Sequence, residues 1–215
     1  MTTRAKLWFV TLLTVIRFPL VIVFFVGAIV YSSTLQPWLF HFTFISLMLS
    51  AITDVFDGYY ARKFGVETRF GAHADPLMDK FFYLSTLPLL VFVAAKDHHM
   101  AHAIVLLVLT LLFLSRDQWV TFLRSIGSMY NVSGTANWSG KLRTSINFPL
   151  VCAIYYFEEA PDSIQVLNQS LIYGCELLAV VVNTVSLYVY TRRYWPYVRR
   201  SATLLGTPTD NSADH

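Results

Sequence analysis

Charged residues are scarce in this chain: Asp, Glu, Lys and Arg together make up 13% of its 215 residues. Soluble domains usually carry about 25%. Hydrophobic residues account for 55% of the chain, and the mean hydropathy is +0.52. This composition excludes an ordinary soluble domain and favours an integral membrane protein. The net charge of +3 is modest, so we expect membrane lipids and no nucleic acid as partners.

Cysteine is nearly absent, with only Cys152 and Cys175, and both lie in apolar runs. Neither has a second ligand nearby in the sequence, so we interpret them as small buried hydrophobic residues and exclude a disulfide framework. Internal repeats and low-complexity segments are also lacking. The length predicts one domain. We assign it to residues 1–200 and expect a polar, disordered tail over residues 201–215.

Six apolar stretches approach the length of about 20 residues that a membrane-spanning helix needs. They cover roughly residues 8–31, 38–63, 76–95, 100–127, 141–157 and 164–190. The polar stretches between them are too short for a separate soluble domain. The sequence therefore predicts an all-α fold, a bundle of six transmembrane helices.

Positively charged residues are scarce in the loops on one side of the predicted bundle. Lys96 is the single basic residue there, and the other charged residues of these loops are acidic. With the N-terminus inside, the inner side receives Arg4, Lys6, Lys63, Arg69, Lys141, Arg143, Arg192, Arg193, Arg199 and Arg200. Basic residues favour the cytoplasmic side of a membrane, so we place both termini there. A transit-like leader rich in Arg and Ser is also missing, which favours a bacterial cytoplasmic membrane.

Local signals place two helix ends and one loop. Gly65 follows the second apolar run at the position of a helix-terminating glycine. Asp75 and Pro76 fit the first turn of the third helix, where proline loses no hydrogen bond. His98, His99 and His102 cluster between the third and fourth spans, and we interpret them as a solvated loop.

Four carboxylates lie in or beside the predicted membrane. Asp54 and Asp57 are spaced i, i+3 on one face of the second helix, and Asp75 and Asp79 are spaced i, i+4 on one face of the third. A short loop joins these helices, so they are expected to be antiparallel neighbours. All four carboxylates would then converge at the cytoplasmic ends of the two helices.

Each carboxylate is costly at this depth, at about 3 kcal/mol for an Asp at mid-membrane. A single intramembrane Asp is often a helix-packing hydrogen-bond partner, but four clustered anions repel one another and require a cation. Two Mg²⁺ ions would balance four aspartates, and all-oxygen ligands suit Mg²⁺, Mn²⁺ or Ca²⁺. Gly58 and Gly71 near this cluster fit either a close ligand approach or close helix packing.

The full pattern is Asp54-x2-Asp57-Gly58-x2-Ala61-Arg62-x8-Gly71-x3-Asp75-x3-Asp79. It resembles the signature of the CDP-alcohol phosphatidyltransferase family at every fixed position, and the six-span layout extends the likeness to most of the chain. The resemblance implies a CDP-linked lipid donor, typically CDP-diacylglycerol, and an alcohol acceptor, with release of CMP. It also implies a homodimer. The convergence of the carboxylates at the cytoplasmic ends of two helices predicts an active site that faces the cytoplasm.

The resemblance assigns a role to each residue of the signature. Two divalent ions, Mg²⁺ or Mn²⁺, would be held by Asp54, Asp57, Asp75 and Asp79. Asp79 would also be the catalytic general base, which takes the proton of the acceptor hydroxyl. The wall of the CDP site would comprise Asp57, Gly58, Ala61, Arg62 and Gly71.

A second region bears on the acceptor. Arg116 and Asp117 in the fourth span, and Lys141 and Arg143 in the fifth, are similar to basic stretches of the phosphatidylglycerophosphate synthase branch. An unpaired cation is costly within a span, so Arg116 is expected to meet an anion. Arg116, Lys141 and Arg143 together would suit a phosphorylated acceptor such as glycerol 3-phosphate. Lys141 and Arg143 also fit a plain positive-inside loop.

Three alternative functions remain at this stage. The first is the same family with another acceptor, namely inositol phosphate, inositol, serine, choline or phosphatidylglycerol. The second is an aspartate-rich membrane prenyltransferase, whose motifs lack the Asp-Gly-x2-Ala-Arg element of residues 57–62. The third is a cation transporter, which predicts polar residues through the whole membrane. Arg17 and Asn147 are further candidates for lining the site.

Overall fold

Six helices make up the described part of the chain, and no strand occurs in it. The structure is a computed structural model that describes residues 3–66, 69–132 and 138–204. Within these ranges, the side chains that it leaves undescribed are those of residues 3, 55, 62, 69–73, 75, 76, 138–141, 203 and 204. The predicted all-α class is confirmed over these residues.

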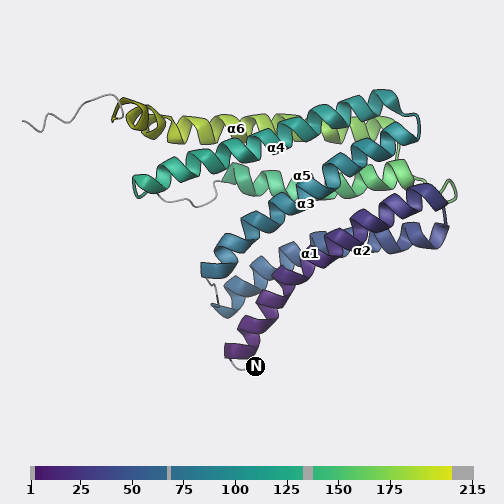
Figure 1. Ribbon diagram of the computed structural model, residues 1–215, viewed down its shortest axis with the longest axis horizontal. Coiled ribbons are helices and arrows are strands. Elements are labelled where there is room, and N and C mark those ends of the chain that lie inside the picture. The colour runs from purple at the N-terminus through teal and green to yellow at the C-terminus, as the bar shows by residue number, and fades with distance from the viewer. Residues whose placement is uncertain (1–2, 67–68, 133–137, 205–215) are drawn as a thin grey trace, which may run out of the picture.

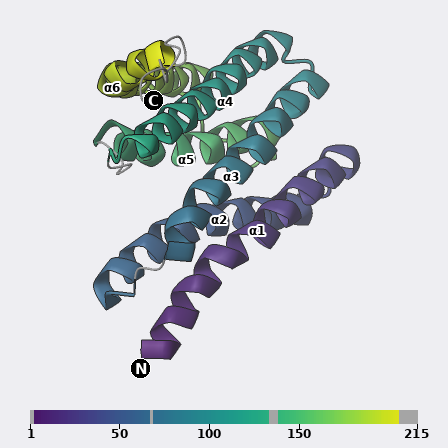
Figure 2. The same cartoon turned by 60° about the vertical axis from the view of Figure 1, so that its left-hand side comes forward.

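The helices alternate in direction along the bundle (Figure 1). They are α1 (Thr3–Thr34), α2 (Pro37–Phe64), α3 (Arg69–Lys96), α4 (Met100–Met129), α5 (Trp138–Glu159) and α6 (Gln169–Leu204). Helix α1 packs on α2 and α3. Helix α3 also packs on α4 and α5, and α6 packs on the same two helices. Figure 2 shows α1, α2 and α3 as one layer that diverges from the other helices toward the N-terminus.

Five of these helices are long and apolar enough to cross a membrane: α1, α2, α3, α4 and α6. Helix α5 is not among them, because its described residues include Arg143, Glu158 and Glu159. The apolar faces of the five helices carry many exposed large side chains, such as Leu107 and Val108 on α4. Exposed apolar surface on this scale suits contact with lipid.

Helix α2 ends as its sequence predicts. Gly65 has a φ of +61°, and the Val66 amide donates to the Ala61 carbonyl over 3.2 Å. This is the hydrogen bond of a glycine-terminated helix. The predicted start of α3 at Asp75 and Pro76 is wrong, because the helix already begins at Arg69. A proline removes one hydrogen bond and disfavours the turn before it, but it can lie inside a helix as well as in the first turn. Pro76 therefore does not fix where α3 begins.

The core lies where the aromatic side chains of several helices meet. Phe24 of α1, Phe40 of α2 and Tyr155 of α5 are almost fully buried. The ring of Tyr155 stacks on that of Phe40 and meets that of Phe24 edge to face. A second, smaller core joins α4 to α6 around Tyr190 and Tyr194. Packing within this framework holds the polar clusters described below in place, because buried aromatic contacts tie α1, α2 and α5 together.

Candidate active site

Three of the predicted metal ligands converge on an arginine of another helix. Asp54 and Asp57 project from α2, Asp79 projects from α3, and Arg17 reaches them from α1. The guanidinium Nη2 of Arg17 lies 2.5 Å from Asp54 Oδ1 and 2.7 Å from Asp57 Oδ2. Its Nη1 lies 3.4 Å from Asp79 Oδ1. Arg17 and these three aspartates are called the carboxylate cluster below.

Burial differs strongly within the carboxylate cluster. The side chains of Arg17 and Asp57 are 1% and 5% exposed, whereas those of Asp54 and Asp79 are 17% and 28% exposed. Thr14 of α1 also donates a hydrogen bond to Asp57 Oδ2 over 3.2 Å. Asp57 is therefore fixed from two positions on α1, and Asp79 keeps the access that a group touching a substrate needs.

The remaining signature residues lie partly outside the described set. Gly58 and Ala61 are half-buried on α2, in the turn that follows Asp57. Four other predicted site residues lie outside the set whose side chains are described. They are Arg62, Gly71, Asp75 and Lys141. The fourth predicted metal ligand is thus not placed.

The chemistry of this donor set fits a divalent cation. Its ligands are carboxylate oxygens, as Mg²⁺ and Mn²⁺ prefer. Three carboxylates surround one guanidinium, so the described part of the cluster keeps an excess of negative charge. Among the described residues, no three His, Cys, Asp or Glu side chains are already arranged to hold a metal ion. The pair of metal ions remains a prediction.

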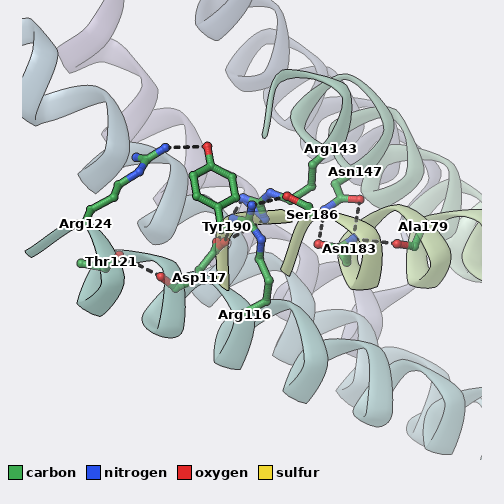
Figure 3. Close-up of polar contacts among 10 residues, drawn as sticks. All are labelled: Arg116, Asp117, Thr121, Arg124, Arg143, Asn147, Ala179, Asn183, Ser186 and Tyr190. Atoms are coloured by element: carbon green, nitrogen blue, oxygen red, sulfur yellow. Dashed lines mark hydrogen bonds and ion pairs between the residues drawn. The ribbon is translucent and has the colours of Figure 1, made fainter. Parts of the chain in front are cut away.

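Arg116 meets an anion, as expected for a cation within a span, and that anion is its neighbour Asp117 (Figure 3). Arg116 Nη1 donates to Asp117 Oδ1 over 2.9 Å, and its Nη2 donates to Ser186 Oγ of α6. Arg143 of α5 donates to Asp117 Oδ2 over 3.1 Å. The Arg116 guanidinium also lies 5.2 Å from the ring of Tyr190. Arg116, Asp117 and Arg143 are called the arginine cluster below.

Two donors of the arginine cluster are buried without a hydrogen-bond partner among the described residues. They are Arg116 Nε and Arg143 Nη1. Arg143 Nη1 lies 3.0 Å from Asp117 Oδ1, but it is not aligned for a hydrogen bond. A buried unsatisfied donor costs about 1–3 kcal/mol. The cluster therefore has the positive charge, and donors that make no hydrogen bond among the described residues, to bind an added anion.

Neighbouring polar side chains brace the arginine cluster (Figure 3). Asn147 of α5 is fully buried and exchanges hydrogen bonds of 3.4 and 3.1 Å with Asn183 of α6. Arg124 lies on α4, about two helical turns after Arg116, and donates to the Tyr190 hydroxyl over 2.9 Å. Asn147 thus pairs with another helix, and it makes no described contact with the carboxylates.

Arg143 links the two clusters. Its guanidinium lies 5.3 Å from the ring of Tyr83 on α3. Tyr83 follows Asp79 by four residues, so the two side chains are neighbours on one helix face, about 6 Å apart along the axis. The arginine cluster therefore approaches α3 within about one helical turn of Asp79.

An apolar groove of about 600 Å³ opens between α2 and α5. It is lined by Met48, Ala51, Ile52, Asp54, Phe56, Thr144, Ser145, Phe148, Pro149 and Cys152. Asp54 is the one charged residue among the described residues that line it, and it also belongs to the carboxylate cluster. A lipid tail in this groove would have its polar end next to the carboxylates.

A third polar cluster, which the sequence interpretation missed, lies at the opposite end of the bundle. His102 is only 3% exposed, and its two ring nitrogens face Glu158 of α5 and Glu176 of α6. His99 Nδ1 lies 2.9 Å from Glu158. The prediction of a solvated loop is therefore wrong for His102, which belongs to α4. The available signal was Glu176, a lone acid within an apolar run.

A family model for CDP-alcohol phosphatidyltransferases matches residues 8–188 of the chain. The chain is also similar to three bacterial proteins named CDP-diacylglycerol–glycerol-3-phosphate 3-phosphatidyltransferase. The protein of Haemophilus influenzae is 30% identical over 141 residues, which are 64% of this chain and 68% of the relative. That of Bacillus subtilis is 34% identical over 110 residues, 51% of this chain and 52% of the relative.

The third relative, from Cereibacter sphaeroides, is 30% identical over 103 residues, 48% of this chain and 46% of the relative. The chain thus spans about half the length of two of these relatives and about two thirds of the third. The family match itself covers both clusters and the groove, since it extends from α1 into α6.

Proposed function

Because the chain belongs to the CDP-alcohol phosphatidyltransferase family, we propose that it transfers the phosphatidyl group of CDP-diacylglycerol to glycerol 3-phosphate. The acceptor hydroxyl attacks the phosphorus that carries the lipid. A new phosphorus–oxygen bond forms, the bond from that phosphorus to CMP breaks, and CMP leaves. The proton of the hydroxyl passes to the protein.

The observation that carries this proposal is the position of Asp54. It lies both in the carboxylate cluster and at the wall of the apolar groove. A lipid-linked diphosphate has this same division, with apolar tails next to a polar head. Burial of the tails in the groove would bring the diphosphate to the aspartates, and phosphoryl transfer depends chiefly on such positioning and on charge stabilisation.

Asp79 is the proposed general base. Its side chain is the most exposed of the three described aspartates, at 28%, and a base must reach the hydroxyl that it deprotonates. Asp54, Asp57, Asp75 and Asp79 would hold the divalent ions. When bound, such ions stabilise the negative charge of the attacking and leaving oxygens. Thr14 donates a hydrogen bond that holds Asp57 in position for this role.

Glycerol 3-phosphate is the proposed acceptor because the arginine cluster offers two guanidiniums with unsatisfied donors. Arginine binds phosphate oxygens through two parallel N–H groups. The similar bacterial proteins are named for this acceptor. Arg143 stacks on Tyr83 near Asp79, so a phosphate held there would present its hydroxyl end to the carboxylate cluster.

The proposed setting is a bacterial cytoplasmic membrane, with both termini and the active site on the cytoplasmic side. The ends of α2, α4 and α6 nearest this side carry Lys63, Arg124 and Arg193, in line with the positive-inside rule. The family resemblance extends this proposal to a homodimer.

An acceptor panel tests the proposal directly. The purified chain in detergent receives CDP-diacylglycerol with Mg²⁺ or Mn²⁺, and release of CMP is followed. Glycerol 3-phosphate, inositol phosphate, inositol, serine, choline and phosphatidylglycerol are offered in turn. We expect metal-dependent CMP release with glycerol 3-phosphate alone. Release with another acceptor would keep the family reaction and remove the proposed acceptor, and release with none would contradict the proposed donor.

A further inference from the structure

Arg17 occupies an unusual position for a charged residue. It lies in the interior of α1, a helix otherwise apolar enough to span a membrane, and its side chain is 1% exposed. A cation in such a place requires an anionic partner. Here it has three, and they are the described members of the predicted metal-ligand set.

The geometry is that of a cation site already filled. One nitrogen of Arg17, Nη2, lies within 2.7 Å of oxygens from both Asp54 and Asp57. A divalent ion bridging the same two oxygens would lie about 2.0–2.6 Å from each of them. The nitrogen and the ion cannot both occupy that volume.

We infer that Arg17 is a resident counterion that competes with a divalent cation for Asp54, Asp57 and Asp79. This inference rests on the proposed function, because it takes these aspartates as metal ligands. Without metal, the guanidinium neutralises part of the cluster and joins α1 to α2 and α3. A divalent cation therefore binds by displacing Arg17 from at least Asp54 and Asp57.

The contacts of Arg17 fit displacement better than a permanent role beside the metal. Arg17 Nε is buried and makes no hydrogen bond among the described residues. Among the described residues, the guanidinium is therefore held through Nη1 and Nη2 alone, by the carboxylates that a metal would take. Thr14 donates independently to Asp57 Oδ2, so Asp57 keeps one of its α1 contacts when Arg17 moves.

Manganese binding to three variants tests this competition. Mn²⁺ alone is titrated into the full chain in detergent, and free Mn²⁺ is measured by electron paramagnetic resonance. Thermal unfolding is followed in parallel with EDTA. Arg17→Gln removes the charge. Arg17→Lys keeps the charge but lacks a second nitrogen, such as the Nη1 that pairs with Asp79. Lys96→Gln removes a charge at the far end of α3 as the matched control.

We expect Arg17→Gln to bind Mn²⁺ about tenfold more tightly or better, because a unit charge at this distance acts strongly in a buried site. The same variant should unfold at a lower temperature in EDTA. Arg17→Lys should bind about threefold more tightly, and Lys96→Gln should match the wild type in Mn²⁺ binding. If Arg17→Gln does not fold, tighter binding by Arg17→Lys supports the inference by itself.

Two outcomes contradict the inference, and they differ in what else they overturn. Saturable Mn²⁺ binding by the wild type, with equal or weaker binding by Arg17→Gln and Arg17→Lys, would make Arg17 a permanent structural or supporting residue and would leave the proposed function intact. Absence of Mn²⁺ binding in the wild type and in both Arg17 variants would overturn the metal site of the proposed function and the competition together.

Discussion

The carboxylate cluster and the arginine cluster are built as opposites. In the first, one arginine lies among three aspartates of α2 and α3. In the second, one aspartate lies between two arginines of α4 and α5. Each cluster contains a single side chain of opposite charge, which pairs with the others. The first cluster therefore keeps an excess of negative charge and the second an excess of positive charge. An added cation would suit the first and an added anion the second.

The two clusters differ in their access to solvent. Asp54 and Asp79 are 17% and 28% exposed, whereas Arg116 and Arg143 are 6% exposed. The carboxylate cluster is therefore open on two of its members, and the arginine cluster is closed by Ser186 and Tyr190. Binding at the first requires exchange of a counterion, and binding at the second also requires side chains to move apart.

The largest effect is expected from Asp79→Asn, which removes the proposed base from the carboxylate cluster. The amide keeps the size of the side chain but cannot accept the proton of the acceptor hydroxyl. General-base catalysis contributes about 100- to 10,000-fold, so CMP release should fall about 1000-fold. Insertion and thermal stability should stay near those of the wild type.

Asp97→Asn is the matched control for this change, because Asp97 follows α3 at the far end of the same helix. Its CMP release should equal that of the wild type. Asp79→Asn with full activity would end the assignment of the base. Equal losses in both variants would point to a general effect of charge on α3.

Glu159 is a buried acid away from both clusters, and it shows how much a buried charge lowers stability where no function is proposed for it. Glu159 is 6% exposed, and its Oε1 has no hydrogen-bond partner among the described residues. Burial, together with the negative charge of Asp97 and of Glu158, raises the pKa of Glu159 from 4.5 to about 7, and Lys96 opposes this rise.

Because the pKa of Glu159 is higher in the folded than in the unfolded chain, its contribution to stability is present below pH 4.5 and is lost as the pH rises through 7. The shift corresponds to at most about 3 kcal/mol. The melting temperature of the wild type should therefore fall between pH 5 and pH 8. Glu159→Gln should reduce that fall and leave CMP release unchanged. A parallel loss of activity would place Glu159 in the catalytic machinery.

The convergence of the aspartates was predictable because it depends on local geometry. The spacings i, i+3 and i, i+4 place the carboxylates on one face of each helix. Helix α1, which packs on both α2 and α3, completes the cluster through Arg17. The termination of α2 at Gly65 was predictable for the same reason. The start of α3 was not, because a proline is compatible with a first turn but does not require a helix to begin there.

The partners of these residues depend on how distant helices pack, which no local pattern states. Arg17 was only a secondary candidate, because its contact with Asp57 requires α1 and α2 to meet at one particular turn. Asp117 was noted for its similarity to a family position, but its place between two arginines needs α4 and α5 to approach. His102 was misjudged because its acidic partners come from α5 and α6.

The arginine cluster gives the smallest expected effect and the sharpest test of the comparison. Arg116→Ala removes a guanidinium whose charged hydrogen bonds to a phosphate are worth about 1.5–3 kcal/mol. The KM for glycerol 3-phosphate should rise about 30-fold, and the KM for CDP-diacylglycerol should change less than about twofold. Ser186→Ala, which removes one hydrogen bond to the same guanidinium, should raise the acceptor KM only about fivefold, as expected for about 1 kcal/mol.

Arg116→Lys separates charge from geometry in this cluster. Lysine keeps the positive charge but lacks the two parallel donors that match a phosphate, so its acceptor KM should lie between those of the wild type and Arg116→Ala. Equal losses for donor and acceptor in Arg116→Ala would remove the arginine cluster from the acceptor site. The opposite signs of the two clusters would then reflect only how each buried charge finds a neighbour. A loss confined to the acceptor would mean that the excess positive charge is kept for an anion.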